Sequence, residues 1–130
     1  HPEMIELLKS LDAPIKGVVH CYTSNWEHAQ QYLDLGLYLG FTGVITFPAK
    51  KTNPKPQEEI LEVVANCPMD RMLIETDAPY LAPQAYRGDR CEPWMVVEVA
   101  KKIAEIKKMG LEEVVQITEQ NTRRLFGKIK

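Results

Sequence analysis

The sequence predicts an α/β fold in which three parallel strands alternate with helices. Three short apolar runs have strand character, and they are continuous, as is typical of strands covered on both faces: 17–22, 37–43 and 72–76. Segments with helical periodicity separate and surround these runs, and this alternation indicates parallel βα units. Because the 130 residues are 45% hydrophobic and 26% charged, we expect one domain over residues 1–130.

Five helices are expected around the three strands. The first covers about residues 4–11. The second follows the first strand, where Ser24 and Glu27 match a capping box, and the third follows Asn53 and Pro54, which look like an N-cap and a first helical position. The fourth and fifth helices show apolar stripes that end near glycines: Val96, Val99, Ala100, Ile103 and Ile106 before Gly110, then Val114, Ile117 and Leu125 before Gly127.

The number of strands limits the possible architectures. Three strands can form a small open sheet, but a (β/α)8 barrel has eight strands and typically about 250 residues. The fold is therefore either a small open α/β sheet or part of a barrel. Because the chain begins with His1 rather than Met, we expect it to be a piece of a longer polypeptide. A half-barrel exposes two unpaired strand edges, so we also expect an assembly or a further segment that covers them.

Charge and cysteine content narrow the class of protein. The formal net charge of -2 lacks the strongly basic balance of a protein that holds DNA by charge alone, so any contact with nucleic acid must be local. The three cysteines form no CxxC pair, which favours reduced thiols in a cytoplasmic protein over a disulfide framework or a thiolate zinc site. No apolar run approaches the roughly 18 residues of a membrane-spanning helix, so no membrane partner is expected.

Two polar residues lie where parallel α/β folds bind ligands. His20 ends the first predicted strand and Asp77 follows the third, and an imidazole and a carboxylate that converge at this edge suit a divalent metal ion. Taken singly, each residue has a commoner explanation. A histidine at a strand end is more often a hydrogen-bonded surface or core group, and Asp-Ala-Pro is good turn chemistry.

Other polar residues are weaker candidates. His28 falls on the polar side of its helix and His1 is the first residue, so neither is expected to bind metal. Cys21 should point to the face of the strand opposite His20, which favours a packing role. The basic pair 50–51 and the cluster 87–90 can contact phosphate, but short charge runs usually lie in solvated loops.

These segments form a set that matches a known family in order and spacing. The matching segments are Gly-Val-Val-His-Cys-Tyr at 17–22, Leu-Tyr-Leu-Gly-Phe-Thr-Gly at 37–43, Leu-Ile-Glu-Thr-Asp-Ala-Pro-Tyr-Leu-Ala-Pro at 73–83, Tyr86-Arg87-Gly88, Glu92-Pro93 and Asn-Thr-Arg-Arg-Leu-Phe-Gly at 121–127. Over nearly its whole length, the chain resembles the later strands and the C-terminus of the TatD family of metal-dependent hydrolases.

The resemblance implies the C-terminal half of a TIM (β/α)8 barrel of the metal-dependent hydrolase type. It implies divalent metal ions (Mg, Zn or Mn), DNA as the partner, and hydrolysis of phosphodiester bonds by a deoxyribonuclease. By resemblance, His20 is the metal-binding histidine after the sixth strand, and Asp77 is a metal ligand and catalytic residue beside the nucleophilic water. Glu75 is at most a supporting residue around the metal, while Arg87 and Tyr80 are substrate-binding candidates.

The chain departs from the family pattern in one important way. A TatD-like site also takes a His-x-His pair, a glutamate and a further histidine from earlier strands, and these are absent here. We therefore expect this chain alone to be inactive and to need either the missing N-terminal half of the barrel or self-association. Two alternatives stay open: the same barrel acting on an amide or ester such as an aminoacyl-tRNA, and a non-catalytic half-barrel association module.

Overall fold

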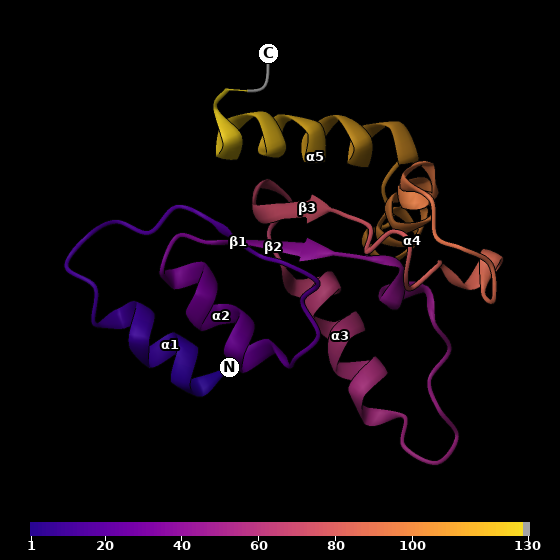
Figure 1. Cartoon of the computed structure of the whole chain (residues 1–130), viewed down its shortest axis with the longest axis horizontal. Helices are drawn as coiled ribbons and strands as arrows, with labels where there is room; N and C mark the ends of the chain where they lie inside the picture. Colours follow the sequence, from indigo (N-terminus) through magenta and orange to yellow (C-terminus); the bar gives the residue numbers. More distant parts are fainter. Residues whose placement is uncertain (129–130) are drawn as a thin grey trace.

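The computed structural model describes residues 1–128, and its centre is a three-stranded parallel sheet (Figure 1). Strands β1 (Val18–Val19), β2 (Tyr38–Phe41) and β3 (Met72–Ile74) lie in the order β1-β2-β3, and both neighbouring pairs are parallel. The predicted strand number and direction are therefore confirmed. Because all three strands point the same way, their carboxyl ends meet at one edge of the sheet.

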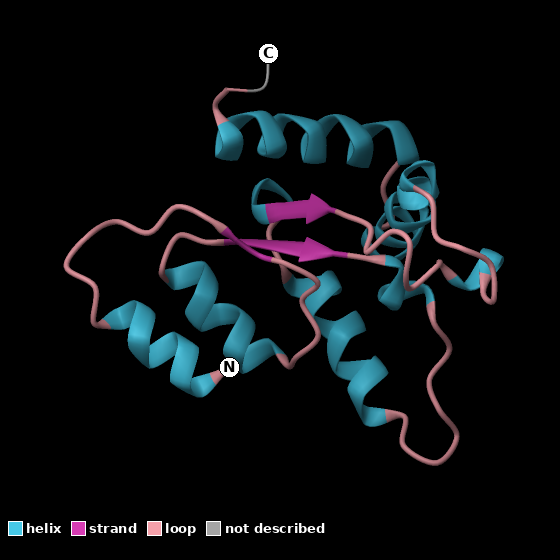
Figure 2. Cartoon of the chain, viewed as in Figure 1, coloured by secondary structure: helices cyan, strands magenta, loops and turns pink. Residues whose placement is uncertain are grey.

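The five predicted helices are all present, together with four short 3-10 turns, and the predicted order of strands and helices is confirmed. Figure 2 shows α1, α2 and α3 below the sheet in this view and α5 above it. The α-helices are α1 (Pro2–Lys9), α2 (Trp26–Asp34), α3 (Lys55–Asn66), α4 (Val96–Lys107) and α5 (Leu111–Phe126), and the 3-10 turns are η1 (Gly43–Thr46), η2 (Met69–Arg71), η3 (Gln84–Tyr86) and η4 (Pro93–Met95).

The two faces of the sheet are covered differently. The larger core joins one face to the helices, and its strand residues are Leu39, Phe41 and Met72, all fully buried. Alternate residues of β2 and β3 point to the other face, where Tyr38 and Leu73 pack against α5. Further along that second face, toward the carboxyl ends of the strands, lies the candidate site.

Several predicted boundaries were wrong by one or two residues. The capping box at Ser24 does not form. Instead Asn25, an equally good N-cap, accepts the backbone N–H of His28 at 3.0 Å, while Ser24 bonds to the His28 ring. Helix α3 has Pro54 as its N-cap, because Asn53 is held in a turn by its bond to the carbonyl of Lys50. Helix α1 covers Pro2–Lys9 rather than 4–11.

The strands are shorter than the apolar runs that predicted them. The first run leaves the sheet after Val19, because Cys21 adopts a left-handed backbone conformation with φ 47°. The second ends at Phe41, where Thr42 begins a 3-10 turn. Among the described residues, β1 and β3 each pair on one side only, so the expectation that something covers their outer edges stays a prediction.

Candidate active site

Three side chains converge at the carboxyl edge of the sheet. His20, just beyond β1, lies between two carboxylates that follow β3. Its Nε2 is 2.7 Å from Oδ1 of Asp77, and its Nδ1 is 2.7 Å from Oε2 of Glu75. The sequence paired His20 with Asp77, and the structure brings both residues together. Glu75, which the sequence placed at most in a supporting position, also contacts the imidazole directly.

The position of Glu75 depends on β2, the strand that lies between β1 and β3. Glu75 follows β3 on the face opposite the main core, and it lies over Gly40 of β2. A Cβ atom on Gly40 would be 2.1 Å from Oε2 of Glu75, so only glycine leaves room for the carboxylate. The backbone N–H of Cys21 donates to the same oxygen at 3.2 Å. A glycine inside an apolar strand signals such a close approach, and the sequence reasoning did not use it.

The environment of the cluster shifts the pKa values of His20 and Glu75. Partial burial disfavours the imidazolium, but the charges of Glu75 and Asp77 and their hydrogen bonds outweigh this effect and raise the pKa of His20 above its ordinary value. Burial raises the pKa of Glu75, although the Cys21 N–H and His20 oppose that shift. Without a cation, the cluster therefore favours an imidazolium held between two carboxylates.

Cys21 has a different environment from the one the sequence predicted. Strand alternation does not apply to it, because the strand has already ended at Val19. Its Sγ lies 3.3 Å from the hydroxyl of Thr42, and the half-buried thiol belongs to the rim of the site. Burial is the main cause that raises the pKa of the Cys21 thiol, and Asp77 acts in the same direction. Cys21 thus contributes its backbone N–H to Glu75 and stays a neutral thiol.

The imidazole and the carboxylates are ligand types that suit a divalent metal ion, but two ligands are too few to complete a metal site. Imidazole nitrogen and carboxylate oxygen suit Zn²⁺ and Mn²⁺, and carboxylate oxygen suits Mg²⁺. Because Glu75 and Asp77 contact opposite nitrogens of one ring, a single ion can take the imidazole together with only one of them. Among residues 1–128 no group of three or more His, Cys, Asp or Glu side chains is arranged to hold an ion. The cluster therefore offers a single ion the imidazole and one carboxylate.

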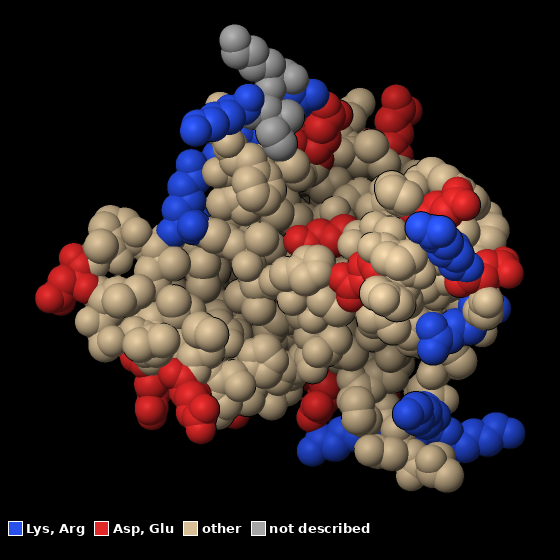
Figure 3. Space-filling model, viewed as in Figure 1, with Lys and Arg blue, Asp and Glu red and all other residues tan. Residues whose placement is uncertain are grey.

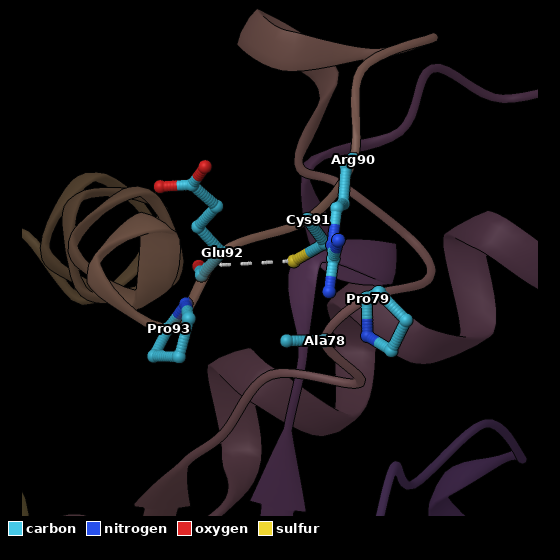
Figure 4. Close-up of a pocket in the computed structure, with 6 residues that line it drawn as sticks. All are labelled: Ala78, Pro79, Arg90, Cys91, Glu92 and Pro93. Atoms are coloured by element: carbon cyan, nitrogen blue, oxygen red, sulfur yellow. Dashed lines mark hydrogen bonds between the residues drawn. The ribbon is translucent and has the colours of Figure 1, made fainter.

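A cavity of about 390 Å³ opens beside the loop that follows Asp77 (Figure 4). Ala78 and Pro79 line it together with residues 90–93, and the Arg90 side chain extends into the space between them. The backbone N–H of Cys91 donates to the carbonyl of Pro79 at 3.0 Å, which closes the loop. This loop is therefore a folded rim that carries both predicted substrate residues.

The structure places the two substrate-binding candidates on that rim, outside the contacts of His20. Tyr80 is 73% exposed, and the guanidinium of Arg87 lies over the Phe47 ring at 4.3 Å from its centroid. His1 and His28, the two rejected histidines, stack on each other at 5.5 Å beside Tyr32, whose hydroxyl bonds to His1. Their contacts are those of a packed aromatic cluster.

A parallel α/β sheet with imidazole and carboxylate groups at the carboxyl edge of its strands is the arrangement expected of a metal-dependent hydrolase. The chain belongs to the TatD family, because the family model described as TatD related DNase matches residues 1–127. The predicted fold class, the C-terminal half of a TIM barrel of the metal-dependent hydrolase type, is confirmed by solved TatD structures that match almost all of this chain and about half of their own length.

Curated relatives and solved structures agree with this family assignment. The metal-dependent hydrolase YabD of Bacillus subtilis is 42% identical over 95% of this chain and 46% of its own length. The 3'-5' ssDNA/RNA exonuclease TatD of Pectobacterium parmentieri is 34% identical over 97% of this chain and 48% of its own. The structure of the TatD homologue YJJV from Escherichia coli is 30% identical, covers 99% of this chain and 47% of that one, and has a TM-score of 0.84. The chain spans about half the length of the relatives it matches.

No helix within residues 1–128 is both long enough and apolar enough to cross a membrane. Cys21, Cys67 and Cys91 are free thiols in this structure.

Proposed function

We propose that His20 and Asp77 bind a divalent metal ion and that the protein hydrolyses phosphodiester bonds of DNA. The observation that carries the proposal is the contact between His20 and Asp77 at the carboxyl edge of a parallel sheet, with Glu75 on the other ring nitrogen. Membership of the TatD family and the name of the Pectobacterium relative, a nuclease, support a nucleic acid as the substrate.

Each residue of the cluster has a distinct chemical role in this proposal. A bound divalent ion lowers the pKa of water and neutralises charge on phosphate oxygens. Asp77 accepts the proton of the attacking water, since its carboxylate reaches the site from the rim and accepts hydrogen bonds there. His20 offers one nitrogen as a neutral ligand, and Glu75 holds the other nitrogen, which fixes the ring orientation and raises its basicity.

Tyr80 and Arg87 contact the substrate in this proposal. Both are exposed on the loop that follows Asp77, so a phosphodiester at the site reaches them without any rearrangement of the core. Arg87 offers a fixed fork of donors to phosphate oxygens, and its contact with Phe47 limits the positions of the guanidinium. Tyr80 offers an aromatic ring on which a base can stack.

The chain on its own is expected to be inactive, because two ligands do not hold a catalytic metal centre. We propose that the other ligands come from the N-terminal half of a barrel or from a second copy. The outer edge of β1 offers a place for such a partner: a groove of about 330 Å³ lies along it, lined by Met4, Leu8, Val19 and Leu37 among others. An added strand there would satisfy the open edge and cover apolar side chains.

A non-catalytic association module is the second candidate, and the open edges of β1 and β3 favour it. The two candidates separate in one assay. The 130-residue chain is incubated with single-stranded DNA and Mg²⁺, Mn²⁺ or Zn²⁺, first alone and then with a polypeptide that supplies the first half of a TatD barrel. We expect no hydrolysis by the chain alone and hydrolysis by the mixture. Turnover by the chain alone that Asp77→Ala removes would contradict the claim of inactivity, and an inactive mixture that forms a stable complex would favour the association module.

The roles of the residues are tested in a full barrel that contains this chain. Asp77→Asn should lower the rate of DNA hydrolysis by about 100-fold or more, because it removes the proton acceptor and a metal ligand. Glu75→Gln should weaken metal affinity by about 10- to 100-fold, since it alters the partner of the ligating imidazole. Asp70→Asn is the matched control, because Asp70 is exposed at the opposite end of β3 and should leave both quantities unchanged. Equal losses in all three variants would contradict the assigned roles.

A further inference from the structure

We propose that the loop between η1 and α3, together with the loop after Asp77, forms a surface that binds a single-stranded nucleic acid leading away from the site. Lys50 and Lys51 contact its phosphates, and the ring of Phe47 with its Arg87 partner receives a base. The identity of the ligand rests on the proposed nuclease function, whereas the surface itself follows from the packing, charge and aromatic groups described next.

The two loops form one continuous surface, because η1, which leads into the first loop, packs against the loop after Asp77, and Arg87 of the second loop lies over Phe47 of the first. The first loop follows the carboxyl end of β2, the middle strand, and therefore leaves the sheet at the same edge as His20 and Asp77. A Cβ on Gly43 would meet the Leu81 carbonyl oxygen at 2.8 Å, so the backbones of η1 and the loop after Asp77 are in contact. The N–H of Gln84 donates to the Thr46 hydroxyl at 2.8 Å and joins them again.

Positive charge is concentrated on these loops although the whole chain is acidic. Residues 48–56 contain three lysines and no acidic residue, whereas the formal net charge of the chain is -2. Blue side chains gather at the lower right of Figure 3, where Figure 1 places the loop between η1 and α3. Lys55 lies 3.6 Å from Glu59, but none of the ion pairs found within residues 1–128 involves Lys50 or Lys51. These two lysines therefore keep their charge available for phosphate.

The backbone holds the two lysines in a tight turn that Lys50 opens and that has Lys51 at its tip. The N–H of Asn53 donates to the carbonyl of Lys50 at 3.2 Å, and the residues between them form the turn. Both lysines are exposed, and Gln57 anchors the base of the loop through its side-chain amide, which donates to the Val44 carbonyl at 3.2 Å. An ordered turn presents its charges at fixed positions, which lowers the entropy cost of binding.

Aromatic groups beside these cations favour a single strand over a duplex. Phe47 is half-buried, and Arg87 covers its ring at 4.3 Å from the centroid. A hollow of about 170 Å³ adjoins the ring and is lined by Lys50, Asn53 and Gln57 among others, which adds amide donors and acceptors next to the aromatic face. Unpaired bases stack on aromatic or guanidinium planes, whereas the bases of a duplex are already stacked on each other.

The test measures binding without catalysis. Fluorescence anisotropy with a labelled 12-nucleotide oligo-dT in EDTA reports the Kd of the 130-residue chain at several salt concentrations. Lys50→Glu/Lys51→Glu should raise Kd about tenfold or more at low salt. It should also reduce the slope of log Kd against log salt by about 1.4, which corresponds to two phosphate contacts of a single strand. Phe47→Leu keeps an apolar side chain but removes the ring, and it should raise Kd several-fold with little change in the salt slope.

Lys9→Glu/Lys16→Glu is the matched control. It makes the same change of charge on exposed lysines near the other end of the sheet, where the loop between α1 and β1 lies at the left of Figure 1. The control should change Kd less than twofold. The inference is overturned if both charge reversals weaken binding equally, if a duplex of the same length binds more tightly than oligo-dT, or if an acidic peptide of equal charge does.

Failure of this inference is distinguishable from failure of the proposed function. A full barrel that contains this chain and cleaves DNA, while Lys50→Glu/Lys51→Glu leaves oligo-dT binding unchanged, would refute the surface and leave the nuclease intact. A full barrel that binds oligo-dT through these residues but cleaves no DNA with any divalent metal would refute the nuclease and keep the surface.

Discussion

Nε2 of His20 lies 2.7 Å from Oδ1 of Asp77, although 57 residues separate them in the sequence and their strands are not neighbours. Strand β2 lies between β1 and β3, so the two loops meet across its end. A side chain at Gly40 would occupy the space that the carboxylate of Glu75 fills. The cluster therefore depends on one glycine in the middle strand as well as on the three polar residues themselves.

Replacing Gly40 by alanine should disturb the cluster of His20, Glu75 and Asp77 although none of these three residues is substituted. The new Cβ would lie 2.1 Å from Oε2 of Glu75, so the carboxylate must move away from His20. Because the charge of Glu75 is the largest contribution that raises the pKa of His20, the pKa of His20 should fall toward its ordinary value. An NMR titration of the imidazole in the metal-free chain measures this change. We also expect overpacking to lower the free energy of unfolding by about 1 to 3 kcal/mol.

Gly110→Ala is the control for that substitution. Gly110 has an ordinary φ of -68°, and a Cβ built on it meets no atom within 4 Å. It should leave the pKa of His20 where it is in the wild type. An unchanged pKa in Gly40→Ala as well would mean that Glu75 does not need the space above β2.

The order of elements could be predicted from the sequence because it depends on local patterns. Apolar runs and helical stripes report burial directly, and they located all three strands and five helices. Boundaries depend on competition between neighbours that pattern alone does not resolve. Ser24 and Asn25 are both good N-caps, and only the path of the chain after β1 decides for Asn25. The contact of Glu75 with His20 could not be predicted from the sequence either, because it depends on the register of the three strands.

Asn121 joins the last helix to the start of β3, and its replacement by aspartate should destabilise the fold. The side chain is 1% exposed, and Nδ2 donates to the carbonyls of Met69 and Met72 at 2.7 and 2.9 Å. Asn121→Asp replaces this donor with an acceptor, so both carbonyls lose the bond from Asn121 and a charge is buried beside them. We expect a loss of about 3 kcal/mol in the free energy of unfolding, measured by urea denaturation.

The neighbouring Gln120→Glu makes the same chemical change on an exposed position of α5. It should alter the free energy of unfolding by less than about 0.5 kcal/mol. Similar losses in both variants would show that negative charge on the helix, rather than the two carbonyl contacts, controls stability there.

Lys108 is a non-glycine residue in a backbone conformation that favours glycine. It ends α4 in a left-handed conformation with φ 53° and ψ 45°, which glycine adopts without the steric cost of a Cβ. Lys108→Gly should therefore raise the free energy of unfolding by about 0.5 to 1 kcal/mol, seen as a higher Tm. Glu105→Gly, one turn earlier in a right-handed helical position, should lower it by about 1 kcal/mol. A lower Tm for both variants would contradict the left-handed helix end.

Cys67 should make the protein lose stability as the solution becomes alkaline. The thiol is fully buried at the end of α3, and burial raises the pKa of Cys67 to about 12. An unfolded thiol ionises near pH 9, so above that pH the unfolded state releases a proton that the folded state retains. The contribution of Cys67 is thus fully present below about pH 9 and is lost as pH rises toward 12, by an amount on the order of 4 kcal/mol.

Cys67→Ala should cost about 1 kcal/mol at pH 7 through the cavity that it leaves. It should also flatten the decline of the free energy of unfolding between pH 9 and 11, measured by urea denaturation at each pH. A decline as steep in Cys67→Ala as in the wild type would mean that the Cys67 thiol ionises freely in the folded state.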